Sequence, residues 1–384
     1  MIERSLAKTL QRRALEFPVV TVTGPRQSGK TTLVRHCFPD YAYANLEDPE
    51  TRDIAETDYH RFFKLFPAPL VIDEIQRVPK LASAIQVLVD ERRDKPGQFI
   101  LTGSHQPLLR QTVTQSLAGR NAFLHLLPLS LKEQNLSPQS GNASVDSLVL
   151  RGGMPELVAS GRDPDVYYRA YLQSYLERDV SLLAGVRHAS AFNRFLVLLA
   201  GRVGQLLNLN SLSGEVGVSH TTLSAWLDVL EASFVVFRLR PWFPKISKRL
   251  VKTPKIYFSE TGFAAHLLGL KSESQVSRDL LRGSLFENLV VSDFVKEMFN
   301  RDGDGELFFF RTSDGLEVDL VRVLPDGIHP VEIKSSMTFS PSLASGLAAS
   351  RKIVPDFADS TVVYAGKTLP PAGGTRFVNF LEAT

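Results

Sequence analysis

The sequence lacks most of the features that mark secreted, membrane-spanning and zinc-binding proteins. Cys37 is the only cysteine among 384 residues, so an internal disulfide is excluded and a reducing cytoplasm is the expected location. No run approaches the roughly 20 apolar residues of a membrane-spanning helix, and the N-terminus has no apolar signal-peptide core. The eight histidines are scattered and form no zinc-ligand pattern.

An excess of charge of one sign is also missing. The 44 Lys and Arg residues and the 41 Asp and Glu residues leave a formal net charge of +3. The sum therefore says little about partners, and only local clusters of charge can identify a nucleic-acid surface. The length allows about two to four domains, each large enough to bury a core.

The most informative segment is GPRQSGKT, residues 24–31, directly after the apolar run 19–23. This is the strand–loop–helix context of a G-x-x-x-x-G-K-[ST] phosphate-binding loop, whose backbone N–H groups wrap around phosphates. Lys30 is expected to reach the β- and γ-phosphates of ATP, and the Thr31 hydroxyl to hold Mg²⁺. The residues expected to bind nucleotide here are Gly24, Pro25, Arg26, Gln27, Ser28, Gly29, Lys30, Thr31 and Thr32.

A second apolar strand, residues 70–72, ends in the acids Asp73 and Glu74. A strand that ends beside the phosphate loop brings Asp73 to the Mg²⁺ ion. Glu74 can then orient and deprotonate the attacking water. The pair of motifs therefore predicts hydrolysis of ATP as well as binding.

Two further positions are expected near the nucleotide. The strand 99–102 is followed by Gly103 and Ser104, and parallel strands place their C-terminal ends at the ligand crevice. Thr102 or Ser104 can therefore sense the γ-phosphate or hold the lytic water, although a hydroxyl satisfied within the strand end is an equal alternative. Arg120 is a candidate arginine finger donated to a neighbouring subunit of a homo-oligomer, with a solvated surface arginine as the alternative.

Periodicity divides the chain into four expected domains. Residues 1–135 alternate apolar strands with amphipathic stretches, as in a parallel α/β core. Residues 136–204 form a helical connector, 205–282 a helix-turn-helix followed by two strands, and 283–384 a second α/β domain. The tyrosines that repeat at helical spacing around residues 168–175 are interpreted as core packing rather than as a base-stacking surface.

A basic segment, residues 238–255, lies in the wing of the expected winged helix. It contains Arg238, Arg240, Lys245, Lys248, Arg249, Lys252 and Lys255 and no acidic residue. Such a segment can contact the phosphate backbone of DNA. Asp228 and Glu231 on the preceding helix would be repelled by phosphates, so we expect backbone contact rather than base readout. A winged helix used for domain packing or subunit contact is the alternative.

Near the C-terminus, three expected strands between residues 306 and 334 carry Asp319, Glu332 and Lys334. Alternation along the last strand puts Glu332 and Lys334 on one face. Glu287 lies upstream in an expected helix. This order of residues resembles the core of the PD-(D/E)XK nucleases.

The nuclease resemblance implies a metal-dependent site. Asp319 and Glu332 would be Mg²⁺ ligands, Glu287 an auxiliary ligand and Lys334 the catalytic lysine. Val318 stands where these nucleases often have a proline. An ion pair between Glu332 and Lys334 on an exposed face is the alternative, as is a nuclease-like fold that survives as an inactive binding module.

The motifs together resemble one family. GPRQSGKTTL, LVIDEIQ, LTGS and SLAGR, followed by RGGMPEL, YLERDV and PKIYFSETG, look like the prokaryotic AAA-type ATPases that carry a C-terminal domain of unknown function. The resemblance spans nearly the whole chain. It implies a P-loop parallel-sheet core, a helical connector, a winged helix and a restriction-endonuclease-like end.

These observations lead to one main hypothesis and two rivals. The main hypothesis is a Mg²⁺-dependent ATPase whose turnover drives or gates an action on DNA. The first rival is a nucleotide-controlled switch or scaffold that binds protein partners and has an inactive nuclease-like domain. The second is a nuclease whose ATPase sets only its oligomeric state.

Overall fold

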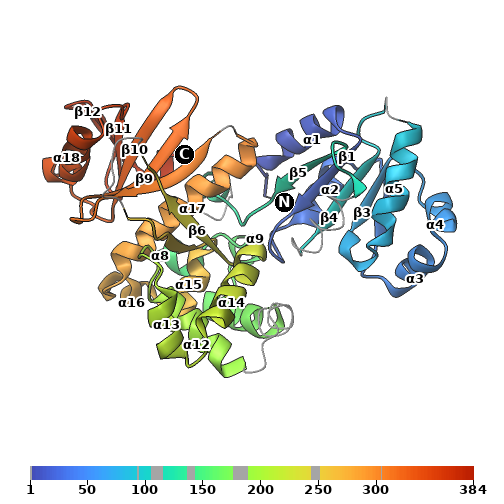
Figure 1. Ribbon diagram of the computed structural model, residues 1–384, viewed down its shortest axis with the longest axis horizontal. Coiled ribbons are helices and arrows are strands. Elements are labelled where there is room, and N and C mark those ends of the chain that lie inside the picture. Colours follow the sequence, from blue (N-terminus) through green and yellow to red (C-terminus); the bar gives the residue numbers. More distant parts are fainter. Residues whose placement is uncertain are drawn as a thin grey trace.

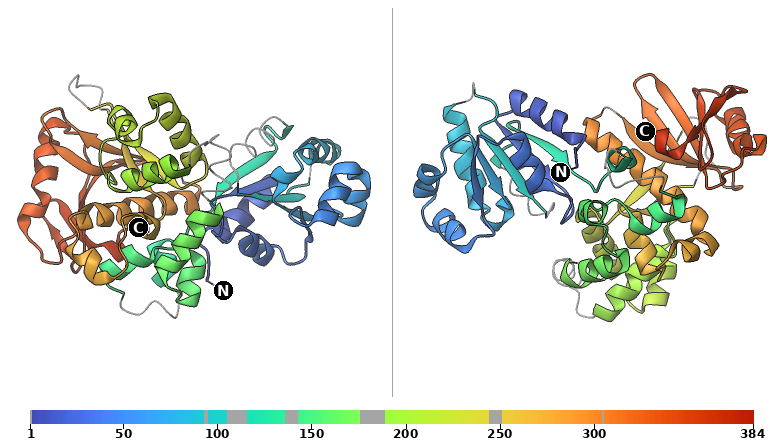
Figure 2. Two further views of the ribbon diagram at one scale, coloured as in Figure 1. Left: turned by 90° about the horizontal axis from the view of Figure 1, so that it is seen from below. Right: turned by 180° about the vertical axis from the view of Figure 1, so that it is seen from behind.

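The computed structural model describes residues 2–92, 95–104, 116–135, 143–175, 189–243, 251–303 and 305–384. Figure 1 shows three lobes: an N-terminal α/β lobe, a helical lobe, and a C-terminal lobe built on a second sheet. The further views in Figure 2 show the N-terminal lobe set apart from the other two. Helix α17 (Arg282–Arg301) contacts both α1 and β5 of the N-terminal lobe, so this helix joins the lobes.

The N-terminal lobe is a parallel sheet of five described strands in the order β2-β3-β4-β1-β5. The strands are β1 (Val19–Thr23), β2 (Ala42–Asn45), β3 (Leu70–Asp73), β4 (Phe99–Gly103) and β5 (Asn121–His125). Its helices are α1 (Leu6–Glu16), α2 (Lys30–Cys37), α3 (Pro49–Thr57), α4 (Tyr59–Leu65), α5 (Lys80–Glu91) and the 3₁₀ helix η1 (Ile75–Arg77). The strands predicted at residues 19–23, 70–72 and 99–102 are confirmed as β1, β3 and β4, and β2 is an additional strand.

Alternation along the strands places a core on each face of this sheet. Val20 and Val22 pack with residues of α1 and α2 on one face. Val19 and Phe99 pack on the other face with residues of α3, α4 and α5. All the strands run the same way, so their C-terminal ends meet at one edge, where the phosphate loop (residues 24–31) begins.

The helical lobe follows a short helix, α7 (Leu131–Asn135), and contains the tyrosines of the predicted stripe. Its helices are α8 (Val145–Arg151), α9 (Pro155–Ser160), α10 (Pro164–Tyr171), α12 (Ala189–Ala200), α13 (Leu209–Val216), α14 (His220–Ala232), α15 (Thr261–Leu267) and α16 (Glu273–Arg278). Tyr168, Tyr171 and Tyr175 are buried in its core, which confirms that the stripe is packing. Gly217 takes a left-handed conformation between α13 and α14, and Ser219 caps α14.

The C-terminal lobe contains a mixed sheet of eight described strands in the order β12-β13-β11-β10-β9-β8-β6-β7. The strands are β6 (Val236–Pro241), β7 (Lys255–Phe258), β8 (Glu306–Arg311), β9 (Glu317–Leu324), β10 (Gly327–Lys334), β11 (Ser360–Tyr364), β12 (Leu369–Ala372) and β13 (Thr375–Asn379). The remaining elements are α18 (Ser345–Ile353), η3 (Pro341–Ala344) and η4 (Phe380–Glu382). The predicted helix and three-strand meander are confirmed as α17, β8, β9 and β10.

The two strands expected to form a wing do more than pair with each other. β6 and β7 are antiparallel, as predicted, but β6 also pairs in parallel with β8. The pair therefore extends the C-terminal sheet instead of projecting from the helices as a free hairpin. No helix in the described part of the chain is long and apolar enough to span a membrane.

Candidate functional site

The phosphate loop turns sharply between β1 and α2. Gly24 leaves β1 at a φ of 156°, and a Cβ built there would lie 2.1 Å from the carbonyl oxygen of Leu126. Gln27 and Gly29 also have positive φ angles, of 63° and 92°. The loop backbone is thus curled tightly at the N-terminus of α2, as the motif predicts.

Lys30 folds back over the loop. Its ammonium donates to the carbonyl oxygens of Gly24, at 3.0 Å, and Pro25, at 2.8 Å. Burial lowers the pKa of Lys30 to about 8, against the opposing charges of Glu74 and Asp73. A buried ammonium held only by carbonyl dipoles is well placed to exchange them for phosphate oxygens.

Asp73 sits at the end of β3 and accepts hydrogen bonds from three hydroxyl groups. Thr31 and Tyr43 donate to Oδ2, each at 2.8 Å, and Thr102 donates to Oδ1. β4 lies between β3 and β1 in the sheet, which is why Thr102 comes between the acid and the loop. The predicted magnesium pair, Thr31 and Asp73, is therefore in direct contact.

Glu74 takes a left-handed conformation with a φ of 58°, which points its carboxylate at the end of β4. Oε2 accepts hydrogen bonds from the hydroxyl of Ser104, at 3.1 Å, and from its N–H, at 3.4 Å. The Gln76 amide donates to the same oxygen. Thr102 and Ser104 thus anchor the two acids, which is the strand-end role that sequence reasoning left open.

A pocket of about 660 Å³ opens beside the loop, between α1, α2 and α9. Its lining is mostly apolar and includes Gly29, Thr32, Leu33, Leu129 and Pro155. Arg4, Lys8 and His36 add charged or polar groups to this lining, and apolar walls with some polar groups are typical of small-molecule sites. Thr32, which the motif predicts to bind nucleotide, therefore lines this pocket beside the phosphate loop.

Arg4 supports the loop from outside the motif, and sequence reasoning did not find it. Its guanidinium donates to the carbonyl oxygens of Ser28 and Leu127, each at 2.7 Å, and to Glu133 at 3.1 Å. The carboxylate of Glu133 is 0% exposed. The hydroxyl oxygen of Ser28 is buried with no hydrogen-bond partner, so the loop retains an unsatisfied polar atom.

Two loop residues point toward the helical lobe. The Arg26 guanidinium lies 5.6 Å from the centre of the Tyr175 ring, and the Tyr167 hydroxyl donates to Gln27. The tip of the phosphate loop is therefore in contact with α10 and with the helical residues 172–175 that follow it. These contacts join the phosphate loop to the helical lobe.

Arg120 lies away from the nucleotide site of its own chain. It precedes β5, whose first residue, Asn121, pairs with Val19 at the start of β1 and thus at the sheet edge opposite the loop. Its guanidinium forms a two-pronged ion pair with Asp90, at 2.7 and 2.9 Å. The structure therefore does not bring Arg120 to this site, and only a role toward a neighbouring subunit stays a prediction.

A second cluster of charges lies in the C-terminal lobe. We call it the carboxylate–lysine cluster; its members are Lys255, Glu287, Glu317, Asp319, Glu332 and Lys334. The Lys334 ammonium lies 2.5 Å from Glu332 Oε1 and 3.6 Å from Asp319 Oδ2. Asp319 also accepts the backbone N–H of Ile333 at 2.8 Å. The three residues predicted from the meander are thus assembled, with both acids buried.

The other half of the cluster includes a residue whose role sequence reasoning missed. Lys255 was assigned to the basic DNA-binding segment, but its ammonium is buried 2.9 Å from Glu287 and 2.5 Å from Glu317. The Tyr257 hydroxyl donates to Glu287 at 2.6 Å, and Arg311 donates to Glu317 at 2.6 Å. Only the position of β7 in the sheet reveals this pairing.

Burial sets the proton affinities in the cluster. Burial, together with the charge of Asp319, raises the pKa values of Glu287 and Glu332 to about 7. Burial alone would lower the pKa of Lys255, but the charges of Glu287, Asp319 and Glu317 outweigh it and hold that pKa above its ordinary value. The ammonium of Lys255 therefore stays charged.

The cluster has the donor type for Mg²⁺ but not an open metal cage. Carboxylate oxygens are the ligands that Mg²⁺ prefers, and Glu332 Oε2 is buried without a hydrogen-bond partner. Within the described ranges, however, no three His, Cys, Asp or Glu side chains are grouped so as to hold a metal. The predicted ligand set of Glu287, Asp319 and Glu332 is thus near but not closed around one point, because lysines lie against the acids.

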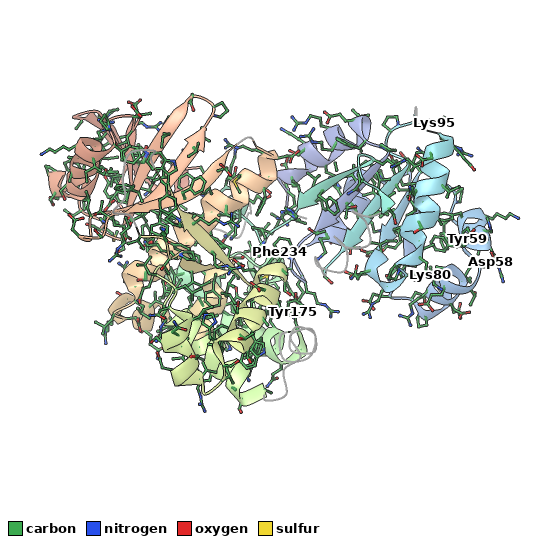
Figure 3. All side chains as sticks on the ribbon, viewed as in Figure 1. Asp58, Tyr59, Lys80, Lys95, Tyr175 and Phe234 are labelled. Carbon is green, nitrogen blue, oxygen red and sulfur yellow. The ribbon has the colours of Figure 1, made fainter. Side chains whose placement is uncertain are left out.

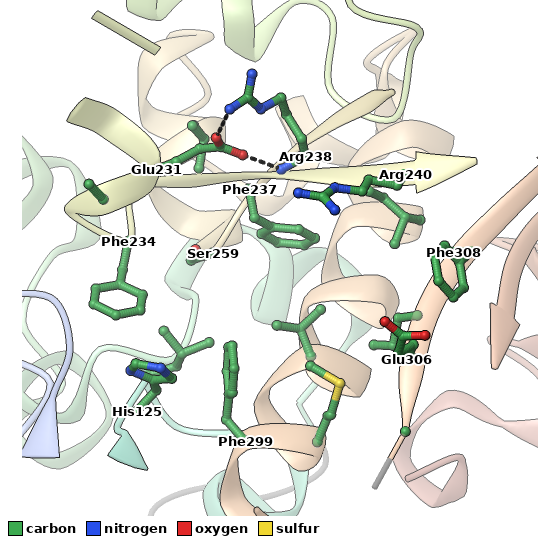
Figure 4. Close-up of a pocket in the computed structure, with 18 of the residues that line it drawn as sticks. His125, Glu231, Phe234, Phe237, Arg238, Arg240, Ser259, Phe299, Glu306 and Phe308 are labelled. Atoms are coloured by element: carbon green, nitrogen blue, oxygen red, sulfur yellow. Dashed lines mark hydrogen bonds and ion pairs between the residues drawn. The ribbon is translucent and has the colours of Figure 1, made fainter. Parts of the chain in front are cut away.

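The basic segment is less available than its sequence indicates. Arg238 is paired with Asp228, at 3.0 Å, and with Glu231, as Figure 4 shows for the second pair. Arg240 and Lys252 are exposed. The prediction for Lys245, Lys248 and Arg249 lies outside the described residues. Internal carboxylates therefore account for two of the predicted phosphate contacts.

Arg240 faces a cavity of about 660 Å³ where the three lobes meet (Figure 4). His125, from the end of β5, lines it, with its ring centre 5.4 Å from that of Phe234 and 5.0 Å from that of Phe299. Figure 3 places Phe234 between the N-terminal lobe and the rest. His125 Nδ1 is 2.8 Å from the hydroxyl of Thr23, the last residue of β1. The cavity therefore lies next to the strand that leads into the phosphate loop.

Comparison with protein families identifies three segments. Residues 16–135 match an AAA domain, which confirms the AAA-type resemblance of the N-terminal lobe. Residues 142–274 match one domain of unknown function (DUF8612), and residues 282–382 match another (DUF4143).

Individual relatives extend over nearly the whole chain. Uncharacterized proteins of Mycobacterium bovis and Mycobacterium tuberculosis are each 33% identical over 380 residues, covering 98% of this chain and 83% of theirs. An uncharacterized protein of Haemophilus influenzae is 25% identical over 366 residues, covering 86% of each chain. Among solved structures, the Walker-type ATPase of Pyrococcus abyssi has a TM-score of 0.43 and 15% identity, covering 70% of this chain and 96% of that one. The chain therefore belongs to the family of these mycobacterial proteins, with an AAA-type P-loop ATPase domain followed by two domains of unknown function.

Proposed function

We propose that the protein hydrolyses ATP at the phosphate loop, with Lys30, Thr31, Asp73 and Glu74 as the working residues. The observation that carries the proposal is the contact of Thr31 with Asp73 beside the buried ammonium of Lys30. Lys30 exchanges its carbonyl partners for the β- and γ-phosphates. Glu74, anchored by Ser104, orients the attacking water and accepts its proton.

The residues around the loop fit a nucleotide with Mg²⁺. When bound, Mg²⁺ would neutralise the negative charge that develops on the phosphates in the reaction. The Thr31 hydroxyl and the Asp73 carboxylate supply oxygen ligands for it. The pocket beside Gly29 and Thr32 takes the base and ribose, because its apolar lining continues directly from the loop.

The proposal also includes an action of the C-terminal lobe on DNA. The buried acids Asp319 and Glu332 and the half-exposed Lys334 form a carboxylate–lysine group of the kind that processes phosphodiesters with a divalent metal. Asp319 and Glu332 would hold the ion, with Glu287 as auxiliary ligand, and Lys334 would face the phosphate. Exposed Arg240 and Lys252 support contact with the DNA backbone. ATP turnover in a homo-oligomer then governs this second site.

A second candidate function is a nucleotide-controlled switch or scaffold for protein partners. The contacts of Arg26 with Tyr175 and of Gln27 with Tyr167 favour it, because they connect nucleotide binding to the helical lobe without any nucleic acid. The internal pairing of Arg238 also favours it. In this case the C-terminal site is a structural ion cluster, and ATP turnover is slow and indifferent to DNA.

One set of measurements separates these functions. ATPase activity with and without DNA, DNA binding at about 50 mM salt, and Mg²⁺-dependent cleavage are compared for wild type, Lys30→Ala and Asp319→Ala. The exposed Lys64→Ala and Asp356→Ala variants serve as controls for loss of a lysine or an aspartate. The main proposal expects DNA-stimulated turnover that only Lys30→Ala abolishes, and cleavage that both site variants abolish.

Each alternative has its own signature. Wild-type ATP turnover in Lys30→Ala contradicts the ATPase assignment. Absence of DNA binding contradicts the DNA role, and nucleotide-dependent assembly with a protein partner then favours the switch. Cleavage that survives Lys30→Ala points to a nuclease whose ATPase sets only the oligomeric state, which sedimentation with a non-hydrolysable ATP analogue would measure.

A further inference from the structure

Three arginines from separate elements line one pocket beside the C-terminal end of α17, which we call the arginine pocket. They are Arg301 of α17, Arg322 of β9 and Arg376 of β13, and the pocket has a volume of about 320 Å³. Leu320, which precedes Arg322 on β9, shares a row across the sheet with Arg376 through the intervening strands β10 and β11. Because side chains alternate along a strand, Arg322 and Arg376 lie on the same face of the sheet. Helix α17 covers this face.

Arg322 has no ion-pair partner among the described residues, although its side chain is half-buried. Its guanidinium lies 5.1 Å from the centre of the Phe294 ring, so it contacts an aromatic face and not an acid. By contrast, Arg282, which is also half-buried, donates to the carboxylate of Asp146 at 2.7 Å. Burial of an unpaired cation is unfavourable, so an anion beside Arg322 would stabilise it.

Positive charge is in excess around the whole pocket. Glu297 is the acid among the described lining residues, and it lies 3.5 Å from Arg301. Arg376 donates to the hydroxyl of Thr361 and not to an acid. Three arginines against one carboxylate therefore leave two positive side-chain charges in excess.

The three guanidinium groups also act on one another. Burial first, and then the charges of Arg301 and Arg376, lower the pKa of Arg322. The charge of Asp326 opposes this effect, but that carboxylate is 74% exposed and lies 3.1 Å from His329. An anion in the pocket would relieve the repulsion between the arginines.

The lining also has an apolar part, which includes Phe294, Met298, Leu307 and Leu324. Guanidinium groups bind phosphate oxygens through paired N–H donors. A phosphate monoester carries a charge of about −1.5 to −2 at pH 7, which matches the excess better than the single charge of a backbone phosphodiester. The volume of the pocket leaves room for a small group attached to the phosphate.

We propose that the arginine pocket binds a phosphate monoester, with Arg322 and Arg376 holding the phosphate and the apolar part of the lining holding the attached group. Arg301, 61% exposed at the rim, adds a third guanidinium. The inference goes beyond the ATPase and DNA proposals and rests on neither. A small phosphorylated molecule and the phosphorylated end of a DNA strand share this chemistry, so the test includes both.

The test measures binding of glycerol 3-phosphate to the full chain by calorimetric titration at constant ionic strength. All proteins carry Lys30→Ala, because a phosphate loop also binds phosphate groups. Arg322→Met and Arg376→Met should each weaken binding about tenfold or more, since each removes a charged hydrogen-bond donor. Arg278→Met, exposed on α16, should bind like the parent. No binding by the parent, or equal affinity in all four proteins, overturns the inference.

A second titration identifies the source of the phosphate. It compares a short 5′-phosphorylated oligothymidylate with the same strand lacking the phosphate. Binding of the phosphorylated strand that is tighter than that of glycerol 3-phosphate, and that Arg322→Met weakens, supports the site and assigns it to DNA ends. Tighter binding of glycerol 3-phosphate supports the site and assigns it to a small molecule.

Stability separates a binding role from a structural one. Arg322→Met replaces an unpaired cation by an apolar side chain, so its Tm without ligand should not fall. A lower Tm with unchanged phosphate binding would give Arg322 a structural role and overturn the inference. If Arg322→Met does not fold, Arg376→Met decides the question, because it changes an exposed residue.

Thr384 also lines the pocket, so its α-carboxylate is tested as a rival occupant. A chain extended by two glycines after Thr384 moves this carboxylate and should bind glycerol 3-phosphate like the parent. Binding in the extended chain alone would make the carboxylate the occupant and overturn the inference. None of these results bears on the ATPase or DNA proposals, because neither uses the three arginines.

Discussion

The Thr31 hydroxyl donates to Asp73 at 2.8 Å, so the phosphate loop and the acid at the end of β3 are already joined. Thr31 and Asp73, the two proposed Mg²⁺ ligands, are thus held together by a single hydrogen bond. β4 lies between β3 and β1 in the sheet, and Thr102 of β4 donates to the other carboxylate oxygen of Asp73. Pre-positioned ligands lower the entropic cost of binding the ion and the nucleotide.

Glu74→Gln is expected to separate ATP binding from ATP hydrolysis. The amide keeps the hydrogen-bonding size of the side chain but cannot accept a proton, so turnover should fall about 100-fold or more while ATP affinity changes little. Single-turnover ATPase assays and equilibrium binding measure the two effects. Glu50→Gln, an exposed acid on α3, is the control. Wild-type turnover in Glu74→Gln would show that another group activates the water.

Gly24→Ala is expected to disrupt the phosphate loop through a backbone clash. Its Cβ would lie 2.1 Å from the Leu126 carbonyl oxygen, and backbone cannot move aside as a side chain can. The variant should lose about 2 to 4 kcal/mol of stability and its nucleotide binding. Gly119→Ala is the matched control, because Gly119 also has positive φ but no atom lies within 4 Å of its Cβ position. Equal losses in both variants, measured by urea unfolding, would assign the effect to φ strain alone.

Arg4→Ala is expected to weaken the N-terminal lobe and its nucleotide site together. The change leaves the buried carboxylate of Glu133 without its cation and frees the Ser28 carbonyl. Removing one partner of a buried ion pair costs about 3 to 5 kcal/mol. Thermal unfolding with and without ATP measures both effects. Arg12→Ala, exposed on α1, should change neither, and Glu133→Gln should recover part of the loss in Arg4→Ala.

Stability in EDTA is expected to fall as the pH rises from about 4.5 to 7. Burial raises the pKa values of Glu287 and Glu332 to about 7 from 4.5, so the folded chain binds more protons than the unfolded chain in this window. Their contribution is fully present below pH 4.5 and is lost as pH rises through 7. Asp293, whose pKa burial raises to about 6 from 3.8, acts in the same direction.

The pH effect is checked by Tm measurements between pH 4.5 and 7.5 on wild type, Glu332→Gln and Glu50→Gln. Glu332→Gln should have a shallower loss of Tm across the window, since it removes one of the titrating groups. Glu50→Gln should follow wild type. Parallel curves for all three proteins would contradict the assignment to the cluster.

Much of the fold follows from local sequence. β1, β3 and β4 are short apolar runs bounded by turn residues, and such runs are fully buried here on both faces of the sheet. β2 escapes prediction because its four residues are mostly half-buried and include two alanines and no β-branched side chain. Residues 42–45 form a strand because they pair in parallel with β3, and a local sequence pattern does not reveal the pairing partner.

The residues of the two sites also fall into those that local sequence predicts and those that depend on distant partners. Residues 24–31, Asp73 and Glu74 are found because their chemistry is written in consecutive residues. Arg4 and Lys255 are missed because their partners, Glu133 and Glu287, are distant in sequence. Lys255 also stands among basic residues, and composition assigns it to the surface when the sheet in fact buries it.

The pairing of β6 with β8 has a consequence for any attempt to divide the chain. The matched C-terminal segment, residues 282–382, does not include β6, although Arg240 and Pro241 pair with Phe308 and Phe309 of β8. Cutting before residue 282 would therefore strip β8 of its neighbour and expose a row of unpaired N–H and C=O groups. Such an edge, here flanked by phenylalanines, recruits strands from other molecules. The isolated C-terminal piece should aggregate, whereas a piece that begins before β6 keeps its edge covered.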